Sequence, residues 1–232
     1  MSLVAKMTSM NYLPDEVYQV HLELSEPAQY IAGQYLEAKL DNGKSSYFTI
    51  ASAPNSNQIE LHIQAFPNSG GMEFVEQLKR TGQLEVNVGH GDTHVERLNK
   101  QDSKIILLAS GTGYSQVKAI TEALIAANDP REVHIYWTGR MSDALYMMKQ
   151  PEQWAKAHDN IRFTALISAH LDWNGLQGSL DRLIIADHPD LSHCQAIACG
   201  SPAMVYHALD VLTAAGLPEG AMFSDVFAYA PR

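Results

Sequence analysis

The hydrophobic pattern of this chain changes near residue 100, and that change constrains the fold more than any other feature. Before it, segments 17–24, 59–65 and 84–88 alternate apolar and polar residues with a period of two. Such alternation is typical of strands with one face in a core and the other in water, as in an antiparallel sheet or barrel. Segment 71–82 interrupts them with helical spacing, and Gly82 is expected to end that helix. The first hundred residues therefore predict an antiparallel β-barrel domain.

After residue 100 the pattern is that of a parallel sheet. Strand-like apolar runs alternate with helical segments, the strands at 104–110, 132–137, 161–167 and 194–200, and the helices after residue 113, at 141–150 and at 201–218. Strands and helices in alternation indicate an open parallel α/β sheet. We therefore expect two domains, a β domain over residues 1–100 and an α/β domain over residues 101–232, with the boundary at 101–103.

Composition excludes several classes of protein. The chain has 16 basic and 26 acidic residues and a net charge of −10, which argues against a general nucleic-acid binder. It has no apolar run of 18 residues and no signal-peptide pattern, so we expect no membrane association and a cytoplasmic location. The two cysteines, Cys194 and Cys199, fit neither a disulfide framework nor a zinc or iron–sulfur spacing. His90 and His94 are expected to lie in a turn, and no metal site is predicted.

Three loops follow predicted parallel strands, at the edge where open α/β sheets bind ligands. The first, 110–115, contains Gly111 and Gly113, which suit either close approach to an anion at a helix N-terminus or a tight turn. The second, 138–140, ends in Arg140, which suits either a phosphate or solvent. In the third, 199–202, Cys199 precedes a helix N-terminus, a setting that can lower a thiol pKa, although most lone cysteines are small buried residues.

The stretch KSSYFTIAS at 44–52 presents an unusual face. With a period of two, Tyr47 and Thr49 share one side of a strand, whereas Phe48 and Ile50 share the other and can fill a core. The period alone does not identify what this aromatic ring and hydroxyl face. Cys194 has no comparable setting and is expected to be structural.

Together these segments resemble the ferredoxin–NADP reductase superfamily and, within it, the bacterial NAD(P)H-flavin reductases. The resemblance rests on seven segments in the same order as in that family: AGQYL at 32–36, SYFTIASAP at 46–54, LHIQA at 61–65, SGTGYS at 110–115, YWTGR at 136–140, CGSP at 199–202, and the C-terminal FSDVFAYAPR. It implies a flavin-binding barrel followed by a nucleotide-binding α/β domain. The implied substrates or cofactors are FMN, FAD or riboflavin, with NADH or NADPH.

The resemblance also implies roles for residues. Thr49 would lie at flavin N5 and Cys199 at the nicotinamide, and these two are the predicted catalytic residues. The predicted flavin-binding residues are Ser46, Tyr47, Phe48, Thr49, His62, Ile63, Gln64, Ser69, Gly70, Phe227 and Tyr229, and Asp225 approaches the flavin. The predicted nucleotide-binding residues are Gly111, Thr112, Gly113, Tyr114, Ser115, Thr138, Gly139, Arg140, Cys199, Gly200, Ser201 and Pro202. The family pattern favours Phe48 as the aromatic beside the flavin, whereas the strand period favours Tyr47.

One departure from the family pattern bears on function. Ser46 stands where the family arginine usually pairs with a flavin phosphate, and Lys44 lies two residues earlier on the same face. Losing a bidentate phosphate partner predicts weak binding of flavin, which then exchanges as a substrate. Two alternatives remain: a reductase with bound FAD that passes electrons to a separate acceptor protein or flavin-dependent enzyme, and a non-catalytic module with the same fold.

Overall fold

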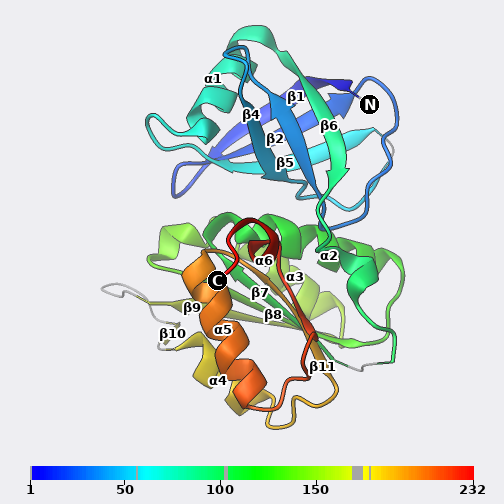
Figure 1. Cartoon of the computed structure of the whole chain (residues 1–232), viewed down its shortest axis with the longest axis vertical. Coiled ribbons are helices and arrows are strands. Elements are labelled where there is room, and N and C mark those ends of the chain that lie inside the picture. Colours follow the sequence, from blue (N-terminus) through cyan, green and yellow to red (C-terminus); the bar gives the residue numbers. More distant parts are fainter. Residues whose placement is uncertain (1, 56, 102–103, 169–174, 178) are drawn as a thin grey trace.

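A computed structural model describes residues 2–55, 57–101, 104–168, 175–177 and 179–232. Two domains are stacked along the long axis of the molecule, with the N-terminal domain at the top of Figure 1 and the C-terminal domain below. The predicted two-domain fold is confirmed. The proposed boundary at 101–103 falls largely outside the described residues and stays a prediction.

The N-terminal domain is an antiparallel sheet that curls toward closure. In the described part of the chain its strands are β1 (Leu3–Leu13), β2 (Val17–Leu24), β3 (Tyr35–Lys39), β4 (Ser45–Thr49), β5 (Gln58–Gln64) and β6 (Gln83–His90). Their order is β4-β3-β6-β1-β2-β5, and an antiparallel bridge between Ile50 and Leu61 joins the two outer ends. The result is the predicted barrel.

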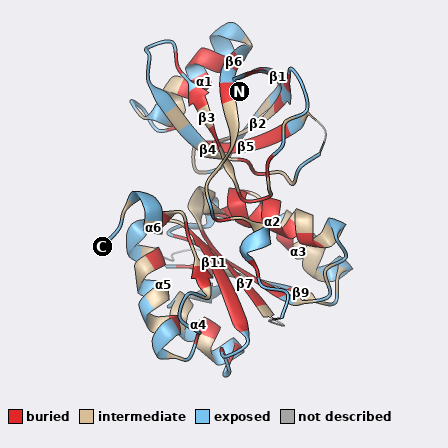
Figure 2. Cartoon of the chain, turned by 45° about the vertical axis from the view of Figure 1, so that its right-hand side comes forward, coloured by how far each residue is buried: buried red, intermediate tan, exposed pale blue. Residues whose placement is uncertain are grey.

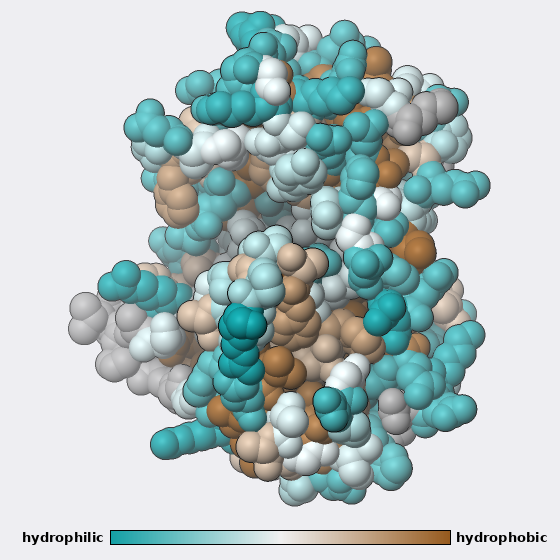
Figure 3. Space-filling model, in the orientation of Figure 1, coloured by the Kyte–Doolittle hydropathy of each residue, from teal (hydrophilic) through white to brown (hydrophobic). Residues whose placement is uncertain are grey.

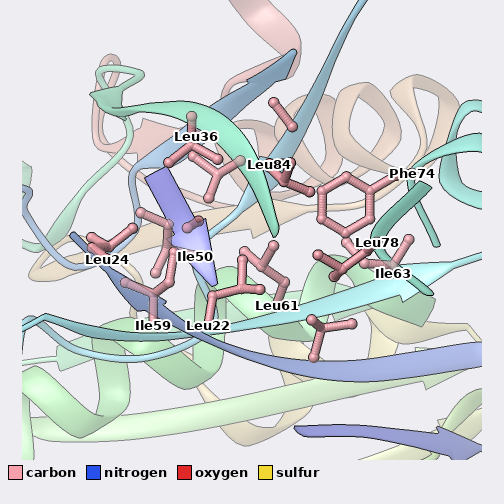
Figure 4. Packing of buried hydrophobic residues seen from close by; sticks show 14 of the residues in the cluster. Leu22, Leu24, Leu36, Ile50, Ile59, Leu61, Ile63, Phe74, Leu78 and Leu84 are labelled. Atoms are coloured by element: carbon pink, nitrogen blue, oxygen red, sulfur yellow. The ribbon is translucent and has the colours of Figure 1, made fainter. Parts of the chain in front are cut away.

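Period-two alternation builds the core of this barrel. Leu22 and Leu24 of β2 and Leu61 and Ile63 of β5 point inward and are almost completely buried, as Figure 4 shows. Helix α1 (Gly70–Thr81) closes one end and contributes Phe74 to this core. Its N-cap is Ser69 and its C-cap is Gly82, whose φ of 70° favours glycine.

The C-terminal domain is a parallel sheet with helices on both faces. Its strands are β7 (Lys104–Ser110), β8 (Glu132–Gly139), β9 (Ile161–Ile167), β10 (Leu176–Gln177), β11 (Cys194–Cys199) and β12 (Met222–Phe223), in the order β10-β9-β8-β7-β11-β12. Its helices are α2 (Tyr114–Ala126), α3 (Lys149–Ala157), α4 (Leu180–Asp187), α5 (Pro202–Ala214) and α6 (Val226–Tyr229). Short 3₁₀ turns are η1 (Val95–Arg97), η2 (Gly111–Gly113) and η3 (Ser142–Ala144). Helices α2 and α3 pack on one face, and α4 and α5 pack on the other.

The chain order of these strands creates a crevice. After β7 the chain adds β8 and β9 on one side and later places β11 on the other side of β7. The loops that leave β7 and β11 therefore run in opposite directions from the carboxyl edge, which is where open α/β sheets bind ligands. Helix α2 starts from the first of these loops and lies between the domains, where Figure 2 shows it largely buried.

One predicted helix is wrong. The segment at 141–150 forms only the turn η3, and the helix of this region, α3, begins at Lys149. The reason is packing: Leu145 and Tyr146 are buried against Trp137, and Leu145 has a non-helical backbone with φ −95° and ψ 49°. Pro151 is tolerated because it lies in the first turn of α3.

No helix in the described ranges is both long and apolar enough to cross a membrane.

Candidate active site between the two domains

A cavity of about 970 Å³ opens between the domains. Figure 3 shows the molecule hollowed between them on the face viewed there. The N-terminal domain contributes Tyr35, Tyr47, Thr49, Gln64, Gly91, Asp92 and Thr93. The C-terminal domain contributes Ser110, Gly111, Thr112, Gly113, Gln116, Ala198, Cys199, Gly200, Ser201, Ser224, Asp225, Val226, Ala228 and Tyr229. The cavity thus joins the strand that carries Thr49 to the crevice at the carboxyl ends of β7 and β11.

Strand β4 presents its polar face to the cavity. Tyr47 and Thr49 line it, and the Tyr47 ring meets the Tyr35 ring edge-on with 5.9 Å between centroids. Phe48 points to the opposite side, where its ring lies 4.7 Å from Phe74 in the barrel core. The expectation that Phe48 lines the site is therefore corrected, because regular pleating of β4 turns successive side chains to opposite faces.

Strand β5 places one of its three predicted residues at the cavity. Gln64 lines it, and its Nε2 donates to Asp15 Oδ2 at 2.8 Å. Ile63 is a core side chain, and His62 is buried in hydrogen bonds to Tyr146 and Glu60. Both side chains belong to the packing behind the cavity rather than to its lining, so their flavin-binding roles stay predictions.

The turn before α1 lies beside β4 but outside the cavity lining. Ser69 Oγ accepts the Met72 N–H at 3.1 Å, so this hydroxyl caps the helix. A Cβ atom added to Gly70 would lie 3.3 Å from Ser46 Oγ, which places Ser46 against the start of α1. Lys44 is exposed, and its Nζ lies 3.9 Å from Glu73 Oε1. The only cation expected to replace the family arginine is thus paired with a carboxylate.

The loop after β7 places its backbone at the cavity. Gly111 has φ 53°, a left-handed conformation that favours glycine. A Cβ atom on Gly113 would lie 2.2 Å from the Cys199 carbonyl oxygen, so only glycine allows the two loops to touch. Tyr114 and Ser115 turn away from the cavity and are buried. The Tyr114 ring stacks on Trp137 at 3.9 Å between centroids, so its side chain packs behind the loop and its contact with the nucleotide stays a prediction.

The loop after β11 brings Cys199, Gly200 and Ser201 to the cavity, whereas Pro202 begins α5 outside it. Cys199 is buried, and its thiol donates to Gln116 Oε1. Burial raises the pKa of the Cys199 thiol well above its usual value, and the Asp225 carboxylate acts in the same direction. Of the two alternatives for Cys199, a thiol with a lowered pKa is therefore contradicted and a buried cysteine is supported, because desolvation outweighs any effect of the following helix.

The loop after β8 lies outside the cavity lining. Gly139 is packed so closely that an added Cβ atom would lie 2.7 Å from Ala144 Cβ. Thr138 is half-buried, and Arg140 is exposed at the carboxyl edge of the sheet. These three residues are adjacent to the nucleotide crevice without facing the cavity, so their nucleotide role stays a prediction.

The C-terminal segment covers one side of the cavity. Tyr229 lines it and is 65% exposed, so its ring lies at the mouth. Phe227 instead packs on Tyr206 with 5.5 Å between ring centroids. Its side chain is part of a hydrophobic cluster and does not line the cavity, so its flavin contact stays a prediction.

Gln116 forms hydrogen bonds to both domains at the cavity, and the sequence did not predict it as a site residue. Its Nε2, which has two hydrogens to donate, lies 2.7 Å from the Gly33 carbonyl oxygen, 2.9 Å from that of Thr93 and 2.9 Å from Asp225 Oδ2, so two of these acceptors share one hydrogen. Burial raises the pKa of Asp225, although bonds from Gln116 and Thr93 lower it in part. Asp92 and Thr93 were also missed, because they follow β6 in a loop without a recognisable motif.

The electrostatics of the cavity are distinctive. Among the described residues that line it, two are carboxylates, Asp92 and Asp225, and none is lysine or arginine. The lining otherwise offers hydroxyls, amides, two tyrosine rings from β3 and β4, and glycine backbone. Flat aromatic rings fit such a space, whereas a phosphate finds no fixed positive side chain within it.

Comparison with known proteins identifies the family. Residues 107–210 match the model of the oxidoreductase NAD-binding domain. The chain is 34% identical over 227 residues to the CDP-6-deoxy-L-threo-D-glycero-4-hexulose-3-dehydrase reductase of Yersinia pestis, covering 96% of this chain and 68% of that protein. It is 28% identical to the NAD(P)H-flavin reductase of Vibrio harveyi, covering 99% of this chain and 100% of the relative.

Solved structures agree on the fold. An Amycolatopsis cytochrome P450 reductase superposes with a TM-score of 0.85 at 22% identity, over 97% of this chain and 69% of its own. A Neisseria gonorrhoeae ferredoxin NADP⁺ reductase with bound FAD and NADP superposes with a TM-score of 0.77 at 14% identity, over 97% and 98% of the two chains.

The family match, the curated relatives and the two-domain fold agree with one another, and they support an oxidoreductase rather than a non-catalytic module. This chain belongs to the ferredoxin–NADP reductase superfamily and is an oxidoreductase that binds a flavin and NAD(P)H.

Proposed function

We propose that the chain reduces a freely exchanging flavin as a substrate, with NADH or NADPH as the hydride donor. The observation that carries this proposal is the absence of lysine and arginine from the described cavity lining, together with Ser46 in place of the expected arginine. A flavin held by stacking and neutral hydrogen bonds lacks the charge-assisted contacts that retain FAD. The same features favour riboflavin over its phosphorylated forms, because Asp92 and Asp225 repel a phosphate.

The chain's own part in the reaction is placement. The nicotinamide, when bound, supplies a hydride and the flavin accepts it. The Thr49 hydroxyl offers a hydrogen bond from the barrel wall. On the opposite wall, Gly111 and Gly200 have no side chains, so a bound ligand can lie close to the backbone there. Cys199 stays protonated at neutral pH because burial raises its pKa, so it acts through packing rather than as a base.

The test is turnover after removal of bound flavin. Protein dialysed extensively is mixed with NADH or NADPH and with riboflavin, FMN or FAD, and oxidation is followed at the nicotinamide absorbance band. The proposal expects saturable dependence on free flavin, with kcat/KM highest for riboflavin and the difference shrinking as salt screens the carboxylates. Stoichiometric yellow flavin that survives dialysis and supports turnover without added flavin would overturn it.

A second candidate is supported by the relatives. The Yersinia protein is named as a dehydrase reductase, and a relative from Comamonas, 28% identical over 94% of this chain, is a terephthalate 1,2-dioxygenase reductase component. These proteins are longer, since this chain spans 68% and 66% of them. In this candidate the chain keeps bound FAD and passes electrons to a separate protein. Activity that needs a protein acceptor and not free flavin distinguishes it.

A further inference from the structure

A buried polar cluster joins the two domains behind the cavity. Lys118, on α2, is 3% exposed. Its Nζ donates to Glu60 Oε2 at 2.7 Å, Glu122 Oε1 at 2.7 Å and the Ala51 carbonyl oxygen at 3.0 Å. Since an ammonium group has three donors, all of them are used. Two of the three partners, Glu60 and Ala51, belong to the other domain.

The cluster continues through the barrel with a defined hydrogen-bond direction. Glu60 Oε1 accepts from Gln19 Nε2 at 2.7 Å and lies 2.8 Å from His62 Nε2. A carboxylate only accepts, so His62 Nε2 carries the proton and Nδ1 accepts the Tyr146 hydroxyl at 3.0 Å. Burial lowers the pKa of His62, which agrees with a neutral ring. Tyr146 belongs to the C-terminal domain, so its bond to His62 is a second contact of the cluster between the domains.

Such a cluster is a poor way to gain stability. Burying a charged group costs about several kcal/mol of folding free energy per ion. Apolar side chains of the same volume at such positions often stabilise the fold as well as the ion pair, or better. Burial acts to raise the pKa of Glu60, yet the His62 hydrogen bond and the Lys118 charge together hold it well below its usual value. The charged groups instead fix how the two domains are placed relative to each other, because their hydrogen bonds are all satisfied in only one placement.

Both ends of the Lys118–Ala51 hydrogen bond lie close in sequence to the cavity walls. Ala51 follows Thr49 by two residues, a span of at most about 7 Å. Lys118 follows Gly113 by five residues of α2, a rise of about 7.5 Å. Glu122 Oε2, one turn further on, accepts the Ala53 N–H at 3.1 Å and holds the same segment.

We propose that Lys118 and Glu60 are positioning residues for hydride transfer, which set the spacing between the wall that carries Thr49 and the loop that carries Gly111 and Gly113. They touch neither substrate, since neither lines the cavity. The inference rests on the oxidoreductase activity of the chain and not on whether its flavin exchanges.

The test compares Lys118→Met with Lys118→Arg in single-turnover hydride transfer at saturating NADH and flavin. A wall displaced by about 1 Å costs about 10²-fold in rate, so Lys118→Met should lose 10- to 100-fold in hydride transfer and kcat at nearly unchanged KM values. Lys118→Arg keeps the charge and the donors and should recover most of that loss. If Lys118 only stabilised the fold, its substitution would not lower kcat while leaving KM unchanged.

The matched control is Arg131→Met, which removes a half-buried ion pair, to Asp129, at the amino end of β8 and far from the cavity edge of the sheet. It should lower thermal stability without changing hydride transfer. If Lys118→Met does not fold, the double variant Lys118→Met with Glu60→Gln leaves no unpaired charge on either residue and is measured instead.

The proposal is overturned if folded Lys118→Met transfers hydride at the wild-type rate, or if Arg131→Met is slowed equally. Wild-type turnover is measured first with riboflavin and with ferricyanide. If the wild type turns over with ferricyanide but not with riboflavin, the exchanging-flavin proposal is contradicted. The positioning proposal is tested separately, by the ratio of the variant's hydride-transfer rate to that of the wild type with whichever acceptor works.

Discussion

Substituting arginine for Ser46 tests why flavin exchanges. The Ser46 hydroxyl lies beside the first turn of α1, where an added Cβ on Gly70 would be 3.3 Å away, so an arginine here is placed near a helix N-terminus that favours anions. A hydrogen bond to a charged group contributes about 1.5–3 kcal/mol, which is roughly 10- to 150-fold in affinity. Glu73 lies in the same helical turn and competes for the guanidinium, so we expect the lower part of this range, about 10- to 30-fold, for FMN.

The assay is a fluorescence titration of FMN and riboflavin into each variant at fixed salt. Riboflavin lacks the phosphate, so its affinity should be unchanged by Ser46→Arg. Adding Glu73→Gln should increase the gain for FMN, and Ser46→Met provides a control of similar length without charge. Equal tightening for both flavins, or none for FMN in a folded variant, would refute the reasoning.

Three other changes test the surrounding structure. Gly113→Ala forces a Cβ against the Cys199 carbonyl oxygen, and this overpacking, about 1–3 kcal/mol, should raise the KM for NADH in steady-state assays while riboflavin affinity is retained. Phe74→Ala should lower the free energy of unfolding in urea by about 3–5 kcal/mol, because the ring is fully buried in the barrel core. Burial raises the pKa of Asp225, so its protonated form favours folding; this stability is present below the usual value of 3.8 and is lost as pH rises through the higher folded pKa. Asp225→Asn should therefore gain stability relative to wild type as pH increases over that window in thermal denaturation, and a constant difference would contradict it.

Much of the fold follows from hydrophobic period. Alternation in 17–24 and 59–65 predicted β2 and β5 because one face of each meets the barrel core. The continuous run at 104–110 predicted β7 because both of its faces are covered by helices. Segment 141–150 misled because Leu145 and Tyr146 are buried, Tyr146 against Trp137, without forming a helix.

The cavity was predictable where local geometry decides which way a side chain points. The period of β4 correctly placed Tyr47 and Thr49 on the cavity side, whereas the family pattern wrongly favoured Phe48. Motifs located the loops of Gly111 and Cys199, yet they did not show which neighbouring side chains turn inward. Tyr114 follows the glycine loop directly, but it stacks on Trp137.

Contacts between the domains could not be predicted. Lys118 and Glu60 are 58 residues apart, and no local pattern pairs them. The same holds for Gln116, whose three acceptors come from residues up to 109 positions away. The raised pKa of Cys199 follows from burial between two loops, which is a property of the packed domains and not of its position before a helix.

The most direct measurement is NADH oxidation by extensively dialysed protein as the concentration of free riboflavin is increased from zero. The cavity lining predicts almost no turnover without added flavin, saturation at high riboflavin, and weaker responses to FMN and FAD. Turnover that is independent of added flavin, carried by FAD that remains bound at one per chain, would contradict reduction of an exchanging flavin.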